Sequence, residues 1–230
     1  MGRGDCRGIA SAIRILDLTR IRLSTATQEY SVGNNHEVPV RNDQEVPISH
    51  DAIIAATRRW VEKAVIGLGL CPFAESVYLR NGVRFQVSEQ RSAAGLLDEL
   101  RSELMHLHQA DARECETTLL IHPWVLNDFV EFNDFLQICD ETVVDLDLEG
   151  EIQVASFHPQ YQFADTQPDD IENHTNRSPY PTLHLLREAS VERALATVAD
   201  PDSIYENNIL RLRELGSAGW AALWTDKREN

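Results

Sequence analysis

Apolar side chains recur every three or four residues along several stretches of the chain, which is the spacing of one buried helix face. The first stretch begins near Ser49 or Asp51, because either side chain can cap the free amides of a helix, and it ends at Gly67 and Gly69. The same spacing predicts three further helices, over residues 92–109, 127–145 and 203–215.

Shorter segments between these helices have the patterns of strands. Residues 83–87 alternate after a turn signal, and residues 117–121 form a short apolar run rich in β-branched side chains. Residues 152–157 are a third segment of this kind. Strands and helices therefore alternate, which predicts an α/β fold, with α+β as the alternative. We expect a small sheet of three or four strands covered by helices in a two-layer sandwich.

Residues 156–188 differ from the rest because they combine histidines, arginines, carboxylates, aromatics and prolines, without core periodicity until Leu183. A loop of this length inside a domain is usually functional or disordered, and its aromatic content argues against disorder. We therefore expect an ordered loop that forms a site. Pro181 suits the first turn of a helix, so the segment after it is predicted to be helical.

Two of the predicted strands end in the same dipeptide. His122 and a proline follow residues 117–121, and His158 and a proline follow residues 152–157. If these strands are parallel, both imidazoles emerge at the carboxyl edge of the sheet, where open α/β folds bind ligands. The alternative interpretation is that both histidines only form hydrogen bonds to the backbone.

The sequence predicts an active site around His158, which would act as a general base or as a metal ligand. On the predicted helix after Pro181, His184, Arg187 and Glu188 share one face. His184 would then be the partner of His158, and Glu188 would orient an imidazole.

Arg177 and Arg187 are predicted to clamp an anionic ligand, because a guanidinium binds phosphates and carboxylates well. An equally weighted alternative pairs Arg177 with an aspartate of the loop, which would stiffen the loop instead. The other residues expected to bind the substrate are Asn176, Ser178, Tyr180 and Tyr161.

Cys71 is a further candidate, as a nucleophile or as an oxidation sensor. It follows the end of a predicted helix, and the partial negative charge there raises the pKa of a thiol. A catalytic role therefore requires His158 or His184 to lie close to it, and packing is the default interpretation.

The cofactor is unknown from the sequence; a divalent metal is one option, and the sequence does not identify which metal. Four carboxylates fall within eight residues of the long loop, and clustered carboxylates suit a cation bound by oxygen. Their spacing fits no EF-hand loop, so a solvated acidic turn is the commoner outcome. These carboxylates are Asp165, Asp169, Asp170 and Glu172.

The length of 230 residues suits one globular domain, which we place at residues 49–230 after a flexible or weakly ordered extension over residues 1–48. The formal net charge of −16 opposes binding to nucleic acids and to anionic membranes. No apolar run is long enough to span a bilayer, and the 4 cysteines form no CxxC pair. We expect a soluble protein of the reducing cytoplasm that binds a small molecule, with an oligomeric state that the sequence leaves open.

Several long motifs between Trp60 and Gly216 resemble a bacterial family of uncharacterised proteins, domain of unknown function 1415. The motifs cover residues 69–74, 132–136, 153–159, 161–164, 175–181 and 184–194. The resemblance extends over about two-thirds of the chain and implies a stand-alone domain that begins near residue 50. It implies no activity, no cofactor and no catalytic residue.

The leading hypothesis is an intracellular enzyme that hydrolyses a small anionic molecule or transfers a group to or from it. The alternatives are a non-catalytic module that binds a ligand or a metal, an interaction protein that docks through the long loop, and a sensor based on Cys71.

Overall fold

The computed structural model describes residues 48–196, 198, 200 and 203–225. The predicted extension over residues 1–48 lies outside this range apart from Ile48. The helices are α2 (His50–Trp60), η1 (Val61–Ile66), α3 (Ala74–Leu79), α4 (Ala93–Gln109), α5 (Phe129–Asp145), η2 (Ile171–Thr175), α6 (Glu188–Leu195) and α7 (Ser203–Ala222). The strands are β1 (Val83–Val87), β2 (Thr117–Ile121), β3 (Ile152–Phe157) and β4 (Thr182–Arg187).

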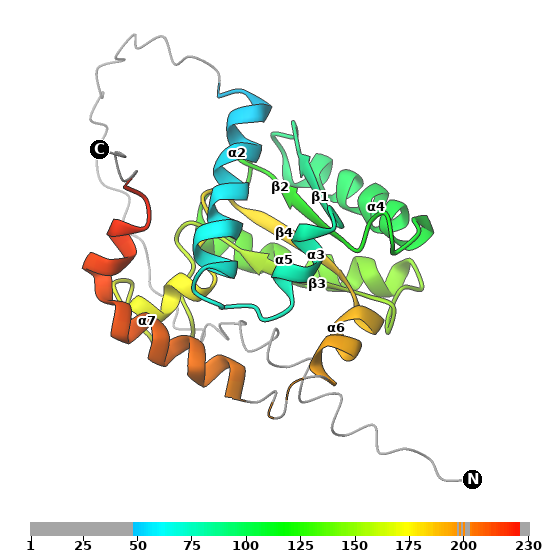
Figure 1. Cartoon of the computed structure of the whole chain (residues 1–230). Coiled ribbons are helices and arrows are strands. Elements are labelled where there is room, and N and C mark those ends of the chain that lie inside the picture. The colour runs from blue at the N-terminus through cyan, green and yellow to red at the C-terminus, as the bar shows by residue number, and fades with distance from the viewer. Residues whose placement is uncertain (1–47, 197, 199, 201–202, 226–230) are drawn as a thin grey trace, which may run out of the picture.

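The four strands form one mixed sheet in the order β1-β2-β4-β3. β1 and β2 are parallel, whereas β4 is antiparallel to both of its neighbours, β2 and β3. β2 and β3 therefore point the same way with β4 inserted between them (Figure 1). The carboxyl ends of β1, β2 and β3 consequently meet at one edge of the sheet, as the sequence predicted for the two strands that end in histidine.

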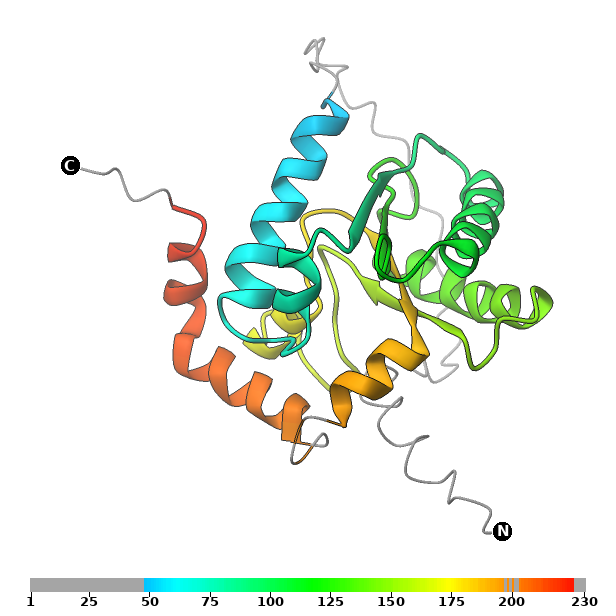
Figure 2. The same cartoon turned by 45° about the vertical axis from the view of Figure 1, so that its right-hand side comes forward.

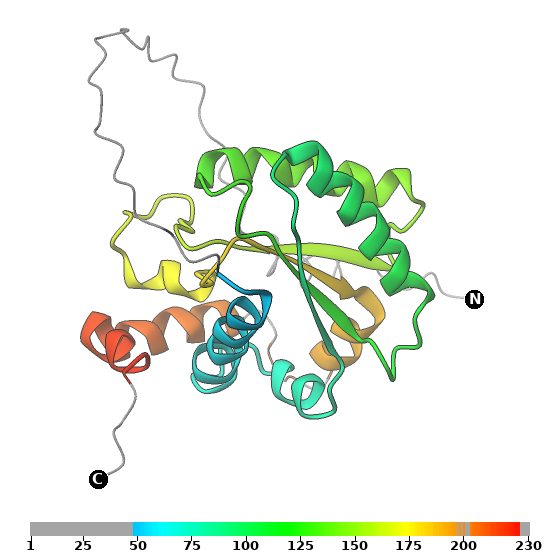
Figure 3. The ribbon, with the colours of Figure 1, turned by 90° about the horizontal axis from the view of Figure 1, so that it is seen from above.

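Helices cover both faces of the sheet (Figure 3). α4 and α5 pack their leucines and phenylalanines on one face, around Leu120, Leu183 and Leu185. α2 and η1 pack on the other face, against Leu119 and Ile121. The predicted α/β class and the small helix-covered sheet are confirmed. Helices lie on both faces, however, so the fold has three layers where the sequence predicted two.

Side-chain caps begin the main helices, and the cap of α2 is one of the two that the sequence predicted. The Ser49 side chain accepts a hydrogen bond from the Ala52 amide, and the Asp128 side chain accepts from the amides of Val130 and Glu131 in α5. After Trp60 the helix continues as the π-helix η1 and ends before Gly67. α7 bends at Gly216, where the sequence predicted an end, because Gly216 has a φ of +63° and glycine tolerates this value.

The segment after Pro181 is a strand and not the predicted helix. Leu183 and Leu185 point toward α4 and α5, whereas His184 between them faces the α2 side, and this alternation has the period of a strand. β4 fills the gap between two parallel strands, where its backbone groups pair on both sides. The carbonyl of Pro181 accepts a hydrogen bond from the amide of His122.

The C-terminal helix closes the α2 side of the molecule (Figure 2). The side chains of Arg59 and Lys63 donate hydrogen bonds to the carbonyls of Trp224 and Leu223. Trp220 stacks edge-on against His174 of η2, with ring centroids 4.4 Å apart. No helix in the described part of the chain is long and apolar enough to cross a membrane.

Candidate functional site

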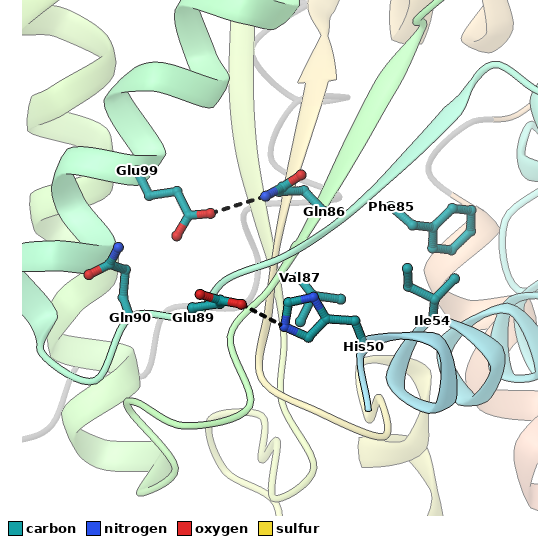
Figure 4. A pocket seen from close by; sticks show the side chains of 8 residues that line it. All are labelled: His50, Ile54, Phe85, Gln86, Val87, Glu89, Gln90 and Glu99. Atoms are coloured by element: carbon teal, nitrogen blue, oxygen red, sulfur yellow. Dashed lines mark hydrogen bonds and ion pairs between the residues drawn. The ribbon is translucent and has the colours of Figure 1, made fainter. Parts of the chain in front are cut away.

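A pocket of about 420 Å³ lies where β1 ends, between α2 and α4 (Figure 4). α2 contributes one side of the pocket, β1 its floor, and the loop after β1 and α4 the other side. The residues that line it are His50, Ile54, Phe85, Gln86, Val87, Glu89, Gln90 and Glu99.

The local structure fixes the polar side chains of this pocket. Because Ser49 caps α2, His50 is its first helical residue and lines the pocket with a partly exposed side chain. Glu99 is held in place by two donors, the Ser88 hydroxyl at 2.5 Å and the Gln86 amide at 3.3 Å. His50 forms an ion-pair contact of 3.3 Å with Glu89 when its ring is protonated.

The pocket is acidic. Of the described residues that line it, two are glutamates and none is a lysine or an arginine. Arg84, on the α4 side of β1, donates to both carboxylate oxygens of Glu103, at 2.9 and 3.0 Å, and to the side-chain oxygen of Gln86 at 2.9 Å. Ile54 and Val87 supply a smaller apolar wall. The arrangement suits a group that carries positive charge or donates hydrogen bonds.

His122 and His158 meet near this edge of the sheet, as the matching strand ends predicted. Both side chains are fully buried, and both rings contact Phe132 of α5, with centroid distances of 5.6 and 5.1 Å. His158 Nδ1 accepts a hydrogen bond from the Gln160 amide, so its Nε2–H donates to the Leu126 carbonyl. His158 is therefore bonded to backbone on both ring nitrogens.

His122 leaves one ring nitrogen without a partner. Its Nδ1–H donates to the Val125 carbonyl at 3.0 Å, and its buried Nε2 has no hydrogen-bond partner among the described residues. Burial lowers the pKa of His122 to about 4 and also lowers the pKa of His158. Both imidazoles are therefore neutral at neutral pH, and His122 carries a free lone pair.

His184 does not join His158, because it lies on the opposite face of the sheet. It stands opposite Leu119 and Ala155 in the ladder, and its Nε2–H donates to the hydroxyl of Thr117 at 2.8 Å. Burial lowers the pKa of His184 to about 4.

The predicted helical face of His184, Arg187 and Glu188 is wrong, since His184 and Arg187 are in β4 and Glu188 begins α6. The three side chains were expected to combine because a helix would have placed them one turn apart. Burial, followed by the nearby Glu192 and Glu149, raises the pKa of Glu188.

Both predicted anion-binding guanidiniums donate to backbone carbonyls. Arg177 donates to Tyr161 at 3.0 Å and to Pro168 at 2.6 Å, and Asp169 acts on it only at longer range. Arg187 donates to Leu107, Ala110 and Cys115, which fixes the C-terminus of α4 to β4.

The other predicted binding residues also serve the loop. The Ser178 hydroxyl donates to the carbonyl of Tyr180, and the Asn176 amide donates to the carbonyl of Ser156. Tyr161 is fully buried in the core between Phe129 and Phe163. The long loop is thus ordered, as predicted, but the Ser178 and Asn176 side chains are bonded within it.

Cys71 follows η1, and burial raises the pKa of its thiol. The groups that oppose this shift are the backbone amides of Phe73 and Ala74 rather than a histidine. In the acidic loop, Asp170 accepts from the Gln167 amide and Glu172 pairs with Arg213 at 2.7 Å. No group of three or more His, Cys, Asp or Glu side chains in the described residues is arranged to hold a metal ion.

Sequence reasoning missed every residue that lines the pocket. The available signal was a set of polar residues at the end of one strand, in the loop after it and on the next helix. These residues are Gln86, Glu89, Gln90 and Glu99. His50 was not recognised as a site residue because it follows the predicted helix cap, Ser49, and its position is explained by the start of the helix alone.

Comparison with known proteins gives a family but no activity. Residues 52–222 match the family described as Protein of unknown function (DUF1415). No curated protein and no solved structure matches the chain.

Proposed function

The chain belongs to the DUF1415 family of proteins of unknown function, and we propose that it is a ligand-binding module whose pocket at the end of β1 holds a positively charged group. One observation carries this proposal: two glutamates face a pocket that no lysine or arginine among the described residues lines. Glu99, held by Ser88 and Gln86, is oriented before a ligand arrives.

Electrostatics favours a cation over the anionic ligand that the sequence suggested. A carboxylate about 4 Å from a cation attracts it by roughly 1 kcal/mol in bulk water and roughly 4 kcal/mol near a protein surface. It repels an anion at the same distance by a similar amount. The arginines that were expected to hold an anion, Arg177 and Arg187, are already bonded to carbonyls. The pocket is therefore matched to an amine or a guanidinium.

Calorimetric titration of the full chain with arginine amide tests this function, with inorganic phosphate as the anionic comparison. We expect binding of arginine amide and none of phosphate. Glu99→Gln keeps the size of the side chain and removes its charge, so it should weaken binding about fivefold, the effect of one partly exposed ion pair. Glu114→Gln, at an exposed site outside the pocket, is the matched control.

The function is wrong if phosphate binds in place of arginine amide. It is also wrong if the Glu99→Gln and Glu114→Gln variants bind arginine amide as tightly as the unaltered protein does.

A second candidate, an enzyme centred on the histidines, is favoured by the unpartnered Nε2 of His122. A neutral, buried imidazole beside His158 is suited to accept a proton in hydrolysis or group transfer. Turnover of a phosphate or carboxylate ester that His122→Asn abolishes, with the fold intact by circular dichroism, would support this candidate. Equal turnover by that variant and the unaltered protein would remove it.

A further inference from the structure

We propose that the pocket is one end of a peptide-binding groove, in which an extended segment of a second protein adds a strand to the open edge of β1. This inference rests on the proposed function, since the positive charge in the pocket would come from a side chain of that segment. The segment would alternate basic and apolar residues. Three features of the described residues support it: an unpaired strand edge, two unlike walls, and the charge around them.

Along the outer edge of β1, backbone hydrogen-bonding groups have no strand partner among the described residues. β1 ends the strand order and pairs only with β2 among the described strands. The Ser88 amide donates to Ile121, and the Gly82 carbonyl accepts from Thr117, so even-numbered residues of this stretch face β2. Because successive residues of a strand point their amides to opposite sides, the N–H and C=O groups of Val83, Phe85 and Val87 point outward.

The pocket follows this same edge. Its floor is made by Phe85, Gln86 and Val87, and the helices α2 and α4 rise on the two sides (Figure 4). A strand laid against β1 would therefore lie in a groove between two helices. Main-chain bonds of this kind supply affinity in strand addition, and the side-chain pockets supply specificity.

The two walls call for different side chains. On the α2 side, Ile54 lies beside Phe85 and Val87, and Arg58 stacks on the Phe85 ring at 4.2 Å. This wall accepts an apolar side chain and repels a basic one. On the α4 side stands Glu99, whose carboxylate accepts a basic side chain, whereas the oxygen of Gln86 already accepts a hydrogen bond from Arg84 at 2.9 Å. Successive side chains of an added strand point to alternate walls, which gives the alternation of basic and apolar residues.

Charge argues against a second copy of this chain as the occupant. Pairing β1 with β1 of another copy would bring the Glu89 and Glu99 side chains of two pockets to one edge, in a protein with a net charge of −16. Like charges placed together across an interface oppose association. A basic segment of another protein instead meets opposite charge.

The test is fluorescence anisotropy of the full chain with a labelled hexapeptide that alternates arginine and valine. The comparison peptide has the same composition but places three arginines before three valines. We expect the alternating peptide to bind about tenfold more tightly, because only it matches both walls. On its addition, hydrogen exchange at the amides of Val83, Phe85 and Val87, followed by NMR, should slow.

Val87→Pro removes one outward amide and leaves the bonds to β2 in place, as proline at a strand edge allows. It should abolish the preference for the alternating peptide. Val87→Ala keeps the amide and is the matched control. If Val87→Pro does not fold, Val83→Pro removes another outward amide and serves instead.

The outcomes separate the two proposals. Binding of arginine amide in the pocket with equal affinity for both peptides overturns the strand addition and keeps the proposed function. Failure of arginine amide and of both peptides to bind overturns both. A dimer in analytical ultracentrifugation that Val87→Pro converts to a monomer overturns the strand addition, because a second copy then occupies the edge.

Discussion

His122 makes the stability of the folded protein depend on pH. Its pKa is about 4 when folded and near 6.5 when unfolded, so the unfolded chain binds a proton between these values that the folded protein does not. The free energy of unfolding therefore falls as the pH falls from 6.5 to 4, by about 3 kcal/mol from this residue. His184 lowers the free energy of unfolding over the same pH range, because its pKa in the folded protein is also about 4.

Urea unfolding of the protein and of His122→Phe at pH 7 and pH 4 measures this contribution. The difference in unfolding free energy between the two proteins should shift by about 3 kcal/mol in favour of the variant at the lower pH. His106→Gln, at an exposed position, is the control. A difference that is the same at both pH values contradicts a neutral, buried His122.

Arg187 holds the end of α4 through hydrogen bonds to backbone carbonyls. Replacing it with methionine keeps the apolar stem and removes bonds to Leu107, Ala110 and Cys115. We expect Arg187→Met to lower the unfolding free energy by about 3 kcal/mol, since the two short bonds, to Leu107 and Ala110, contribute about 1.5 kcal/mol each and the longer bonds to Cys115 add little.

Arg113→Met is the control in the same denaturation experiment, because Arg113 is exposed and its side chain pairs with Asp111 alone among the described residues. It should leave stability unchanged. If Arg187→Met is also neutral, the guanidinium is available to a ligand, as the sequence had suggested.

At the scale of elements, Asn173 organises the long loop. Its side-chain oxygen accepts from the Phe163 amide and the Thr166 hydroxyl, and its amide donates to the Gln167 carbonyl. Asn173→Ala should therefore leave the buried Phe163 amide unsatisfied and remove two partly buried hydrogen bonds, which destabilises the loop by about 2 to 3 kcal/mol. Limited proteolysis should then cleave the variant at least tenfold faster between residues 163 and 171, an effect of local opening.

Asn207→Ala removes an exposed asparagine side chain whose amide donates to the Ser203 hydroxyl, and it should not change the cleavage rate. Equal cleavage of the Asn173 variant and the unaltered protein would mean that the proline and aromatic residues order the loop without this network.

Elements with strong local signals could be predicted from the sequence. The strands at 83–87, 117–121 and 152–157 have the predicted bounds, and α4 begins directly after the Ser92 cap. β4 could not be recognised, because Leu183, Leu185 and Leu186 fit a helical stripe as well as a strand. Its pairing with β2 and β3, distant in sequence, decides between the two, and no local pattern records that pairing.

At the scale of the whole molecule, the sequence located the edge of the sheet but not the site on it. The matching ends at His122 and His158 correctly predicted that parallel strands finish together. Arg177 and His184 were predicted as site residues because their side chains are chemically reactive types. In the structure they bond to a backbone carbonyl and to a threonine hydroxyl. The pocket is instead built from a cap-adjacent histidine and common polar residues, which become a site only when α2 and α4 flank β1.

The central claim is that this pocket binds a positively charged group. The most direct measurement is an NMR titration of the isotope-labelled full chain with arginine amide, with the backbone amides assigned. We predict shifts at residues 50–54, 85–90 and 99, and none around His158 and Arg177. Shifts confined to the surroundings of His122, His158 and the long loop, with the pocket amides unmoved, would contradict it.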